Sequence, residues 1–234
     1  MFSSIPGRAS IMTFSGIDAN PGDMSVRIDH PNSDAALAHF LPNLTGVGTE
    51  DFENLTPGPI SSTLTFPGAG TTATLTGSVT VQNVPTGTDS NGHYPISGNQ
   101  YLEDDAPSFS LSFSQPVDAF GFYGVDIGDM GGILTLQLAN GSSTSLMVPS
   151  GPIPAEDNSS VLYFGFYGTT AADEFTSITF TNSNTADGFA FDDMSIGTFA
   201  ELASVPEPGS LTLLALGVAG LFGYRWHRRR TTGA

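Results

Sequence analysis

The chain has 234 residues, no cysteine and a formal net charge of −17 at pH 7, so disulfides, thiol chemistry and thiolate metal sites are excluded. It also has no lysine, and its first 200 residues carry 21 acidic groups against Arg8 and Arg27, so we expect no nucleic-acid partner. A body of about 200 residues is long enough to bury the core of one domain.

Residues 1–48 contain one predicted strand and the only convincing helix of the body. Residues 10–17 favour a strand that ends in a polar turn. Residues 34–41 favour a helix that Ser33 or Asn32 caps and Pro42 ends. We expect this segment to pack on the body and interpret His39 as a packing residue.

Residues 49–200 show the pattern of many short strands. Residues 62–66 and 71–84 are strand candidates, and from Ser108 onward apolar and polar residues alternate at regular spacing. Nine or ten strands with one apolar face each predict a mainly β fold, a single jelly-roll-like β-sandwich. The pentapeptide FGFYG occurs at residues 120–124 and 164–168. It marks either equivalent strands of two sheets or core strands whose backbones approach closely.

A polar segment over residues 86–107 is the longest predicted loop. Loops of this length are usually functional or disordered. Tyr94 and Tyr101 lie in it, next to Asn99 and Gln100. If their rings are exposed, these two tyrosines are candidate platforms on which a sugar ring could stack.

Acid-rich segments suit a hard cation, because Ca²⁺ takes six to eight oxygen ligands. The best candidates are Asp51 and Glu53 near the start of the β region and Asp192 and Asp193 near its end. A solvated surface is the competing interpretation for most of the carboxylates.

Two further cation sites are less favoured. Asp126 and Asp129 lie in a second acidic loop, which we interpret as a turn. The histidines of the body, His30, His39 and His93, show no zinc-ligand spacing.

The early Phe-Glu pair and the late Phe-Asp-Asp triplet resemble the galactose-binding-like jelly rolls of carbohydrate-binding modules. The resemblance covers roughly residues 49–197. It implies a structural calcium that bridges the two chain ends, and it carries over to Glu53 and Asp192 only. Strand alternation would place Asp192 on one face with Met194 and Ile196, where a carboxylate needs a partner or a metal.

No catalytic motif is evident, so we expect no enzyme activity. There is no Gly-x-Ser-x-Gly elbow, and nothing fixes two carboxylates at the separation that glycoside hydrolysis needs, although a hydrolase stays open. Ice binding would need a flat, regular threonine ladder. Four threonines in one predicted strand are ordinary strand formers; they are Thr71, Thr72, Thr74 and Thr76.

The last thirty residues carry three features in a fixed order. Pro206, Glu207 and Pro208 predict an extended breaker within a linker over residues 201–209. Residues 210–226 predict a short hydrophobic transmembrane helix, and a basic cytoplasmic tail follows at 227–234. The arginines at this end are Arg225, Arg228, Arg229 and Arg230.

This order closely resembles the PEP-CTERM sorting signal of Gram-negative bacteria, a tail also catalogued as an ice-binding protein C-terminal domain. The resemblance implies recognition by an exosortase, a membrane cysteine transpeptidase, which cleaves near residues 206–208 and transfers the body to the cell surface or the exopolysaccharide matrix. Residues 1–23 hold no apolar run of the signal-peptide kind. We therefore expect the true start to lie upstream of Met1.

These features predict a non-enzymatic surface or exopolysaccharide-matrix protein that is exported and sorted by an exosortase. Before processing it would be anchored in the membrane, and afterwards it would lie at the cell surface or in the biofilm matrix. Two alternatives remain, a calcium-stabilised carbohydrate-binding module and a secreted hydrolase.

Overall fold

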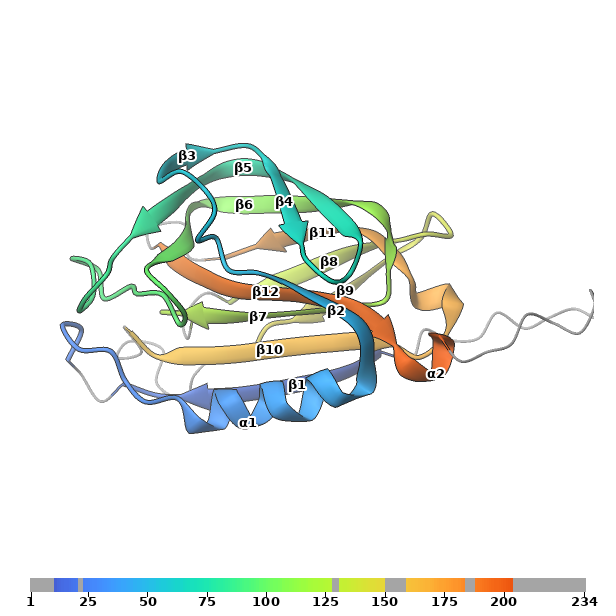
Figure 1. The fold of residues 1–234 in the computed structure, drawn as a ribbon, viewed down its shortest axis with the longest axis horizontal. Helices are drawn as coiled ribbons and strands as arrows, with labels where there is room; N and C mark the ends of the chain where they lie inside the picture. Colours follow the sequence, from blue (N-terminus) through green and yellow to red (C-terminus); the bar gives the residue numbers. More distant parts are fainter. Residues whose placement is uncertain (1–10, 21–22, 128–130, 150–158, 184–187, 204–234) are drawn as a thin grey trace, which may run out of the picture. The chain divides into compact units, whose positions relative to one another are not determined.

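The computed structural model describes residues 11–20, 23–127, 131–149, 159–183 and 188–203, which form a mainly β body with one ten-residue helix (Figure 1). The first half contains β1 (Ile11–Asp18), α1 (Pro31–Phe40), β2 (Leu44–Glu50), β3 (Gly58–Ile60), β4 (Thr63–Phe66) and β5 (Thr71–Asn83). The second half contains β6 (Gln100–Val117), β7 (Ala119–Val125), β8 (Ile133–Leu138), β9 (Ser143–Met147), β10 (Val161–Gly168), β11 (Phe175–Thr181), β12 (Phe189–Phe199) and the short α2 (Ala200–Ala203).

The strands form one antiparallel sheet that curls into two facing layers. The order of its strands is β1-β10-β7-β12-β6-β11-β8-β9. In addition, β2 pairs with β12, β5 pairs with β6, and both β3 and β4 pair with β5. The early part of β6 pairs with β12 and its later part with β11, so the sheet divides there. The rings of Phe122 on β7 and Phe180 on β11 lie 5.4 Å apart although these strands are not neighbours. The predicted β-sandwich is thereby confirmed.

The interior between the layers is filled mainly by phenylalanine and leucine. The predicted alternation places one face of many strands in this core, as for Phe109, Leu111 and Phe113 on β6. Burying such large rings dominates the energetics of a core. The opposite face of β6 carries serines, and Ser110 and Ser112 lie opposite Thr76 and Thr74 of β5.

Helix α1 covers the outer face of β1 and β10, which makes a second apolar layer (Figure 1). Phe40 of α1 is fully buried, and its ring lies 6.0 Å from that of Tyr163. The two FGFYG segments are adjacent strands of one layer, and Gly121 pairs with Gly165. A Cβ atom on Gly121 would collide with the Tyr163 hydroxyl. The interpretation as equivalent strands in two sheets is therefore wrong, and the close-approach interpretation is supported.

The start of α1 differs from the prediction. The helix begins at Pro31, and its N-cap residue His30 makes no side-chain capping bond. Asp18, at the end of β1, instead accepts the backbone N–H groups of Asn32 at 3.0 Å and Ser33 at 2.8 Å. A carboxylate at this position satisfies free helical donors and complements the helix dipole. The cap comes from a distant strand, so the local sequence could not reveal it.

The β region and the long loop also have different bounds from those predicted. Strand β2 begins at Leu44, and the predicted loop over residues 86–107 is shorter, because β6 already begins at Gln100. The predicted linker beyond residue 203, the helix over 210–226 and the tail over 227–234 fall outside the described residues. No helix in the described part of the chain is long and apolar enough to cross a membrane.

Candidate functional site

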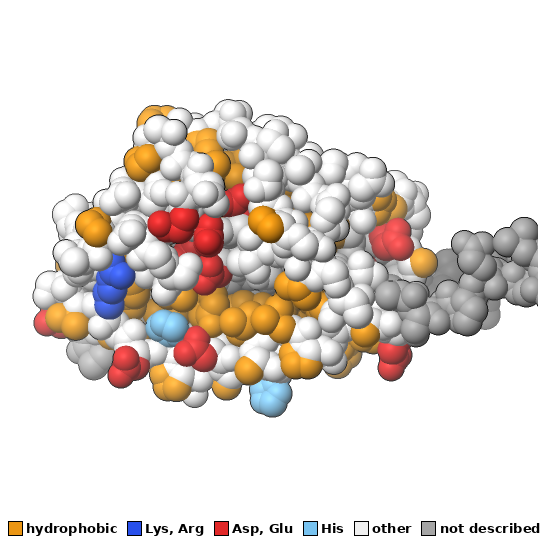
Figure 2. All heavy atoms as spheres, in the orientation of Figure 1, with side chains coloured by type: hydrophobic (Ala, Val, Ile, Leu, Met, Phe, Trp, Pro, Cys, Tyr) orange, Lys and Arg blue, Asp and Glu red, His pale blue; other side chains and the backbone are white. Residues whose placement is uncertain are grey.

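An apolar band crosses the face of the molecule that α1 covers only in part (Figure 2). Figure 2 shows apolar side chains gathered between a group of carboxylates and the α1 side of this face. The partly buried apolar residues packed against this outer layer include Ile28, Leu37, Leu41, Val47 and Ile96. We call these five residues the apolar band.

The carboxylates beside the apolar band hold residues 96–100, which are the end of the loop before β6 and the first residue of that strand; we call this segment the 96–100 loop. Asp192 Oδ2 accepts the backbone N–H groups of Ile96 at 2.8 Å and Ser97 at 3.0 Å. Glu53 Oε1 accepts those of Asn99 at 2.7 Å and Gln100 at 2.6 Å. The two residues predicted to form a metal site, Glu53 and Asp192, are thus brought to the same loop from opposite ends of the domain.

The position of Asp192 depends on a bulge that the sequence did not reveal. The register of β12 against β7 shifts between Asp192 and Ser195, and Asp193 has a positive φ of 46°. This extra residue lets Asp192 face the outer loop, whereas Met194 and Ile196 enter the inner core. The prediction that Asp192 shares a face with Met194 and Ile196 is therefore wrong.

Mutual repulsion and burial characterise this carboxylate group. Burial, followed by the charge of Asp193, raises the pKa of Asp192 well above its usual value. Burial, followed by the charges of Asp51 and Glu53, raises the pKa of Asp193. Such a group binds a proton or a cation more readily than separate carboxylates do.

The chemistry of the donors fits a hard cation. The Asp192 oxygens already accept backbone bonds, including the N–H of Asp193 at 2.7 Å. Asp51 Oδ1 accepts the Glu53 N–H at 3.2 Å, and Asp193 Oδ1 accepts the Ser97 hydroxyl at 2.8 Å. These groups offer oxygen donors only, which suits Ca²⁺.

Across the apolar band, α1 supplies polar groups that sequence reasoning missed. His30 Nδ1 lies 2.9 Å from Asp34 Oδ1, and the Tyr123 hydroxyl donates to the same oxygen at 2.7 Å. Burial raises the pKa of Asp193, and His30 opposes this rise, so the two sides of the band interact electrostatically. The helical spacing of His30 and Asp34, four residues apart, was the available signal.

The two predicted sugar platforms, Tyr94 and Tyr101, lie in the interior. Their exposed fractions are 2% and 0%. The Tyr94 hydroxyl donates to the Ser159 carbonyl at 3.2 Å, and the Tyr101 hydroxyl donates to Asp89 at 2.9 Å. Stacking on a sugar needs an exposed ring face, so neither tyrosine meets that condition. A loop rich in polar residues does not by itself show which of its rings is exposed.

Comparison with known proteins supports the interpretation of the tail. Residues 204–230 match the PEP-CTERM protein-sorting motif, which implies export and processing by an exosortase. No curated protein matches the chain significantly.

Several solved structures align with part of this chain at low sequence identity and with TM-scores below 0.5. The K2 cleaved adhesin domain of Lys-gingipain is 14% identical over 65% of this chain and 98% of that one, with a TM-score of 0.40. The CBM22-1 xylan-binding domain of Paenibacillus barcinonensis Xyn10C is 16% identical over 64% and 92%, with a TM-score of 0.37. The family 11 carbohydrate-binding module of Clostridium thermocellum Lic26A-Cel5E is 10% identical over 66% and 95%, with a TM-score of 0.30.

Proposed function

We propose that this chain is a non-enzymatic protein of the cell surface or the exopolysaccharide matrix, and that it binds a polysaccharide along the apolar band. The observation that carries the proposal is the apolar band itself. The band lies between two polar groups, the carboxylates around Asp193 on one side and the His30–Asp34 pair on the other. Binding sites for small molecules combine apolar walls with a few placed polar groups. The C–H faces of a sugar would pack on the band, and its hydroxyls would donate to the carboxylates.

The net negative charge of the chain disfavours anionic polysaccharides as ligands. A body with 21 acidic groups and two arginines in its first 200 residues repels anionic polymers. We therefore propose a neutral polysaccharide. The sorting motif at residues 204–230 supports a place of action outside the cytoplasm, where such polymers occur.

We propose that calcium stabilises this site structurally and does not take part in a reaction. Glu53, Asp192 and Asp193 all bond the 96–100 loop, whose Ile96 belongs to the apolar band. A Ca²⁺ ion bound between Glu53 and Asp193 would offset their repulsion and fix this loop. Loss of calcium would then weaken polysaccharide binding without any contact between ion and sugar.

The test is retention on neutral polysaccharides by affinity electrophoresis, with and without calcium. Replacing Leu37 and Ile96 together by serine removes apolar contact from the two sides of the band, so we expect at least a tenfold loss of affinity. Ile133→Ser is the matched control, because Ile133 is 41% exposed on β8, outside the band. Equal retention of both variants would contradict the proposed site.

A hydrolase is a second candidate, because Asp192 and Asp193 form an adjacent pair of carboxyls with raised pKa values. The same polysaccharides would be assayed for release of reducing ends. We expect none. Release by the wild type that Asp193→Asn abolishes would replace the binding proposal by an enzymatic one.

A further inference from the structure

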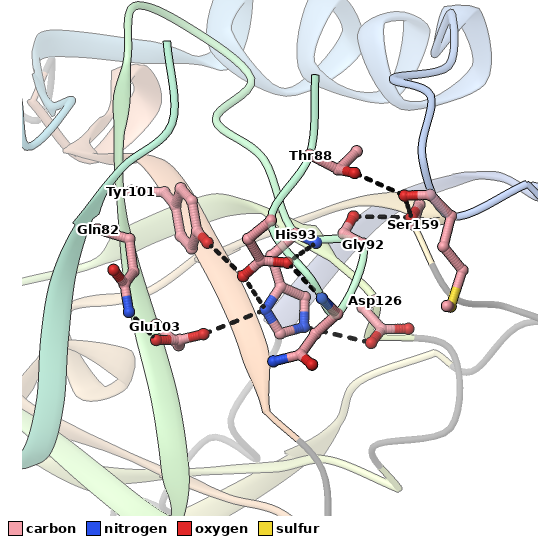
Figure 3. A network of polar contacts seen from close by, with 11 residues as sticks. Gln82, Thr88, Gly92, His93, Tyr101, Glu103, Asp126 and Ser159 are labelled. Atoms are coloured by element: carbon pink, nitrogen blue, oxygen red, sulfur yellow. Dashed lines mark hydrogen bonds and ion pairs between the residues drawn. The ribbon is translucent and has the colours of Figure 1, made fainter. Parts of the chain in front are cut away.

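His93 lies at the centre of a buried polar network that the proposed binding site does not use (Figure 3). Its side chain has no exposed surface, and carboxylates approach both ring nitrogens. Asp89 Oδ2 lies 3.2 Å and Glu103 Oε1 lies 3.3 Å from Nδ1, and Asp126 Oδ2 lies 3.3 Å from Nε2. Figure 3 shows the imidazole ring between Glu103 and Asp126.

These distances are long for simple ion pairs. Charge-assisted N–H···O bonds are usually about 2.7–2.9 Å long. One N–H on Nδ1 also cannot point at both Asp89 and Glu103. By contrast, a tetrahedral metal with bonds of about 2.0–2.2 Å separates neighbouring ligand atoms by about 3.4 Å. Nδ1 and the two oxygens lie within 4.8 Å of one another.

The groups around these three atoms are arranged as the outer partners of a metal site usually are. Metal-bound histidines commonly donate their second N–H to a carboxylate, and here Nε2 faces Asp126. Gln82 donates to the other oxygen of Glu103. Asp89 Oδ1 accepts the backbone N–H groups of Asn91 and His93, each at 2.8 Å. Each of the three side chains is thus oriented by a second contact.

The network also has an excess of negative charge. Asp89 and Glu103 both face Nδ1 of one imidazole, so even a protonated ring leaves a formal excess of one negative charge among the three proposed ligands. Arg27, the one arginine in the described part of the chain, bonds the carbonyls of Val84 and Gly87 instead. Buried charges are normally paired or bound to metals. The Asp89 side chain is 20% exposed, which leaves the network accessible to an ion.

We propose that Asp89 Oδ2, His93 Nδ1 and Glu103 Oε1 bind one divalent transition-metal ion of the zinc class. A ligand set of one imidazole and two carboxylates suits Zn²⁺, whereas Ca²⁺ and Mg²⁺ take oxygen ligands. The ion fixes the 84–99 loop to β6, because Asp89 and His93 lie in that loop and Glu103 lies on the strand. This site is separate from the calcium proposed between Glu53 and Asp193.

The test uses the full chain after treatment with a chelator, followed by dialysis against Zn²⁺. We expect one zinc per chain by elemental analysis and a rise in the unfolding temperature on addition of Zn²⁺. Glu103→Gln should weaken zinc binding at least tenfold, and Asp126→Asn should weaken it by about 10–100-fold through loss of the outer contact. These conservative changes keep the shape of each side chain, so both variants should still fold.

The matched controls are Glu53→Gln and His39→Ala. Glu53→Gln tests the calcium site and should leave zinc binding unchanged, and His39 is exposed on α1. Less than a tenth of a zinc per chain with an unchanged unfolding temperature would overturn the proposal. Zinc binding that survives in Glu103→Gln but falls in His39→Ala would also overturn it.

Discussion

At the scale of single residues, the carboxylates act mainly as acceptors for the backbone. Glu50 accepts the N–H groups of Phe52 and Thr65, each at 2.9 Å, and Asp118 accepts that of Phe199 at 3.0 Å. A chain without lysine offers few cations, so buried acids take backbone donors instead. Most of the described carboxylates are at least partly exposed, as the interpretation of a solvated surface expects, and the buried exceptions are Asp18, Glu50, Glu103, Asp104, Asp118, Asp126, Asp173 and Asp192.

Asp118 allows a test of what burial costs. Burial raises its pKa from 3.8 to about 6. Because the folded-state pKa lies above the unfolded value, the charged form destabilises the fold above about pH 6, and this penalty disappears below about pH 4. Asp118→Asn keeps the acceptor for Phe199 and removes the charge. We expect a gain on the order of 1 kcal/mol at pH 7 and a smaller one at pH 4 by urea unfolding. A variant less stable than the wild type at pH 7 would contradict this.

At the scale of elements, the alternation of apolar and polar residues predicted where the strands lie, but it did not predict which other elements cover them. Every residue of β7 and β10 is buried, because the opposite layer covers one face of these strands and α1 packs on the outer layer that they form. Strand partners and registers depend on contacts distant in sequence, which no local pattern contains. Pro107 shows the same limit. The sequence suggested that a loop ends at this proline, but β6 continues through it, and Pro107 separates the part of β6 that pairs with β12 from the part that pairs with β11.

The close packing of β7 on β10 predicts a coupled pair of substitutions. The Tyr163 hydroxyl is buried and has no hydrogen-bond partner among the described residues. Tyr163→Phe removes this unsatisfied group and should be neutral or stabilising. Gly121→Ala forces a methyl group against that hydroxyl and should cost about 1–3 kcal/mol.

The double variant distinguishes this cause from a general effect of replacing glycine. Because Tyr163→Phe removes the atom that the new methyl group meets, Gly121→Ala should cost less in that background. Chemical denaturation of all four proteins gives the coupling energy, which we expect to exceed 0.5 kcal/mol. Strictly additive effects would show that the hydroxyl is not the obstacle.

At the scale of the whole molecule, the sequence predicted the β-sandwich and the sorting motif, and it predicted the candidate site only in part. Glu53 and Asp192 both hydrogen-bond residues 96–100, and the calcium that the family resemblance implied there stays a prediction. The His93 network was missed because its members lie on the 84–99 loop, on β6 and just beyond β7. Their spacing along the chain carries no metal-binding pattern, and only the fold brings them together.

The sorting motif gives the prediction that concerns the whole chain. Residues 204–230 match the motif, which includes Pro206 and Pro208. Proline lacks the backbone N–H that a helix needs and disfavours helical conformation in the residue before it, so changing both prolines to alanine removes the two local barriers to helix formation in the motif. In the native host we expect the wild type at the cell surface without the residues beyond about 208. The variant should stay uncleaved in the membrane fraction.

Mass spectrometry of each fraction measures both outcomes. Pro57→Ala, an exposed proline of the body, controls for loss of proline as such. A full-length wild type in the cytoplasm would contradict export, and equal cleavage of the wild type and the Pro206/Pro208 variant would show that the exosortase does not depend on the prolines. If the prediction holds, the protein that meets the matrix is the sandwich alone, and the apolar band is the surface that it presents there.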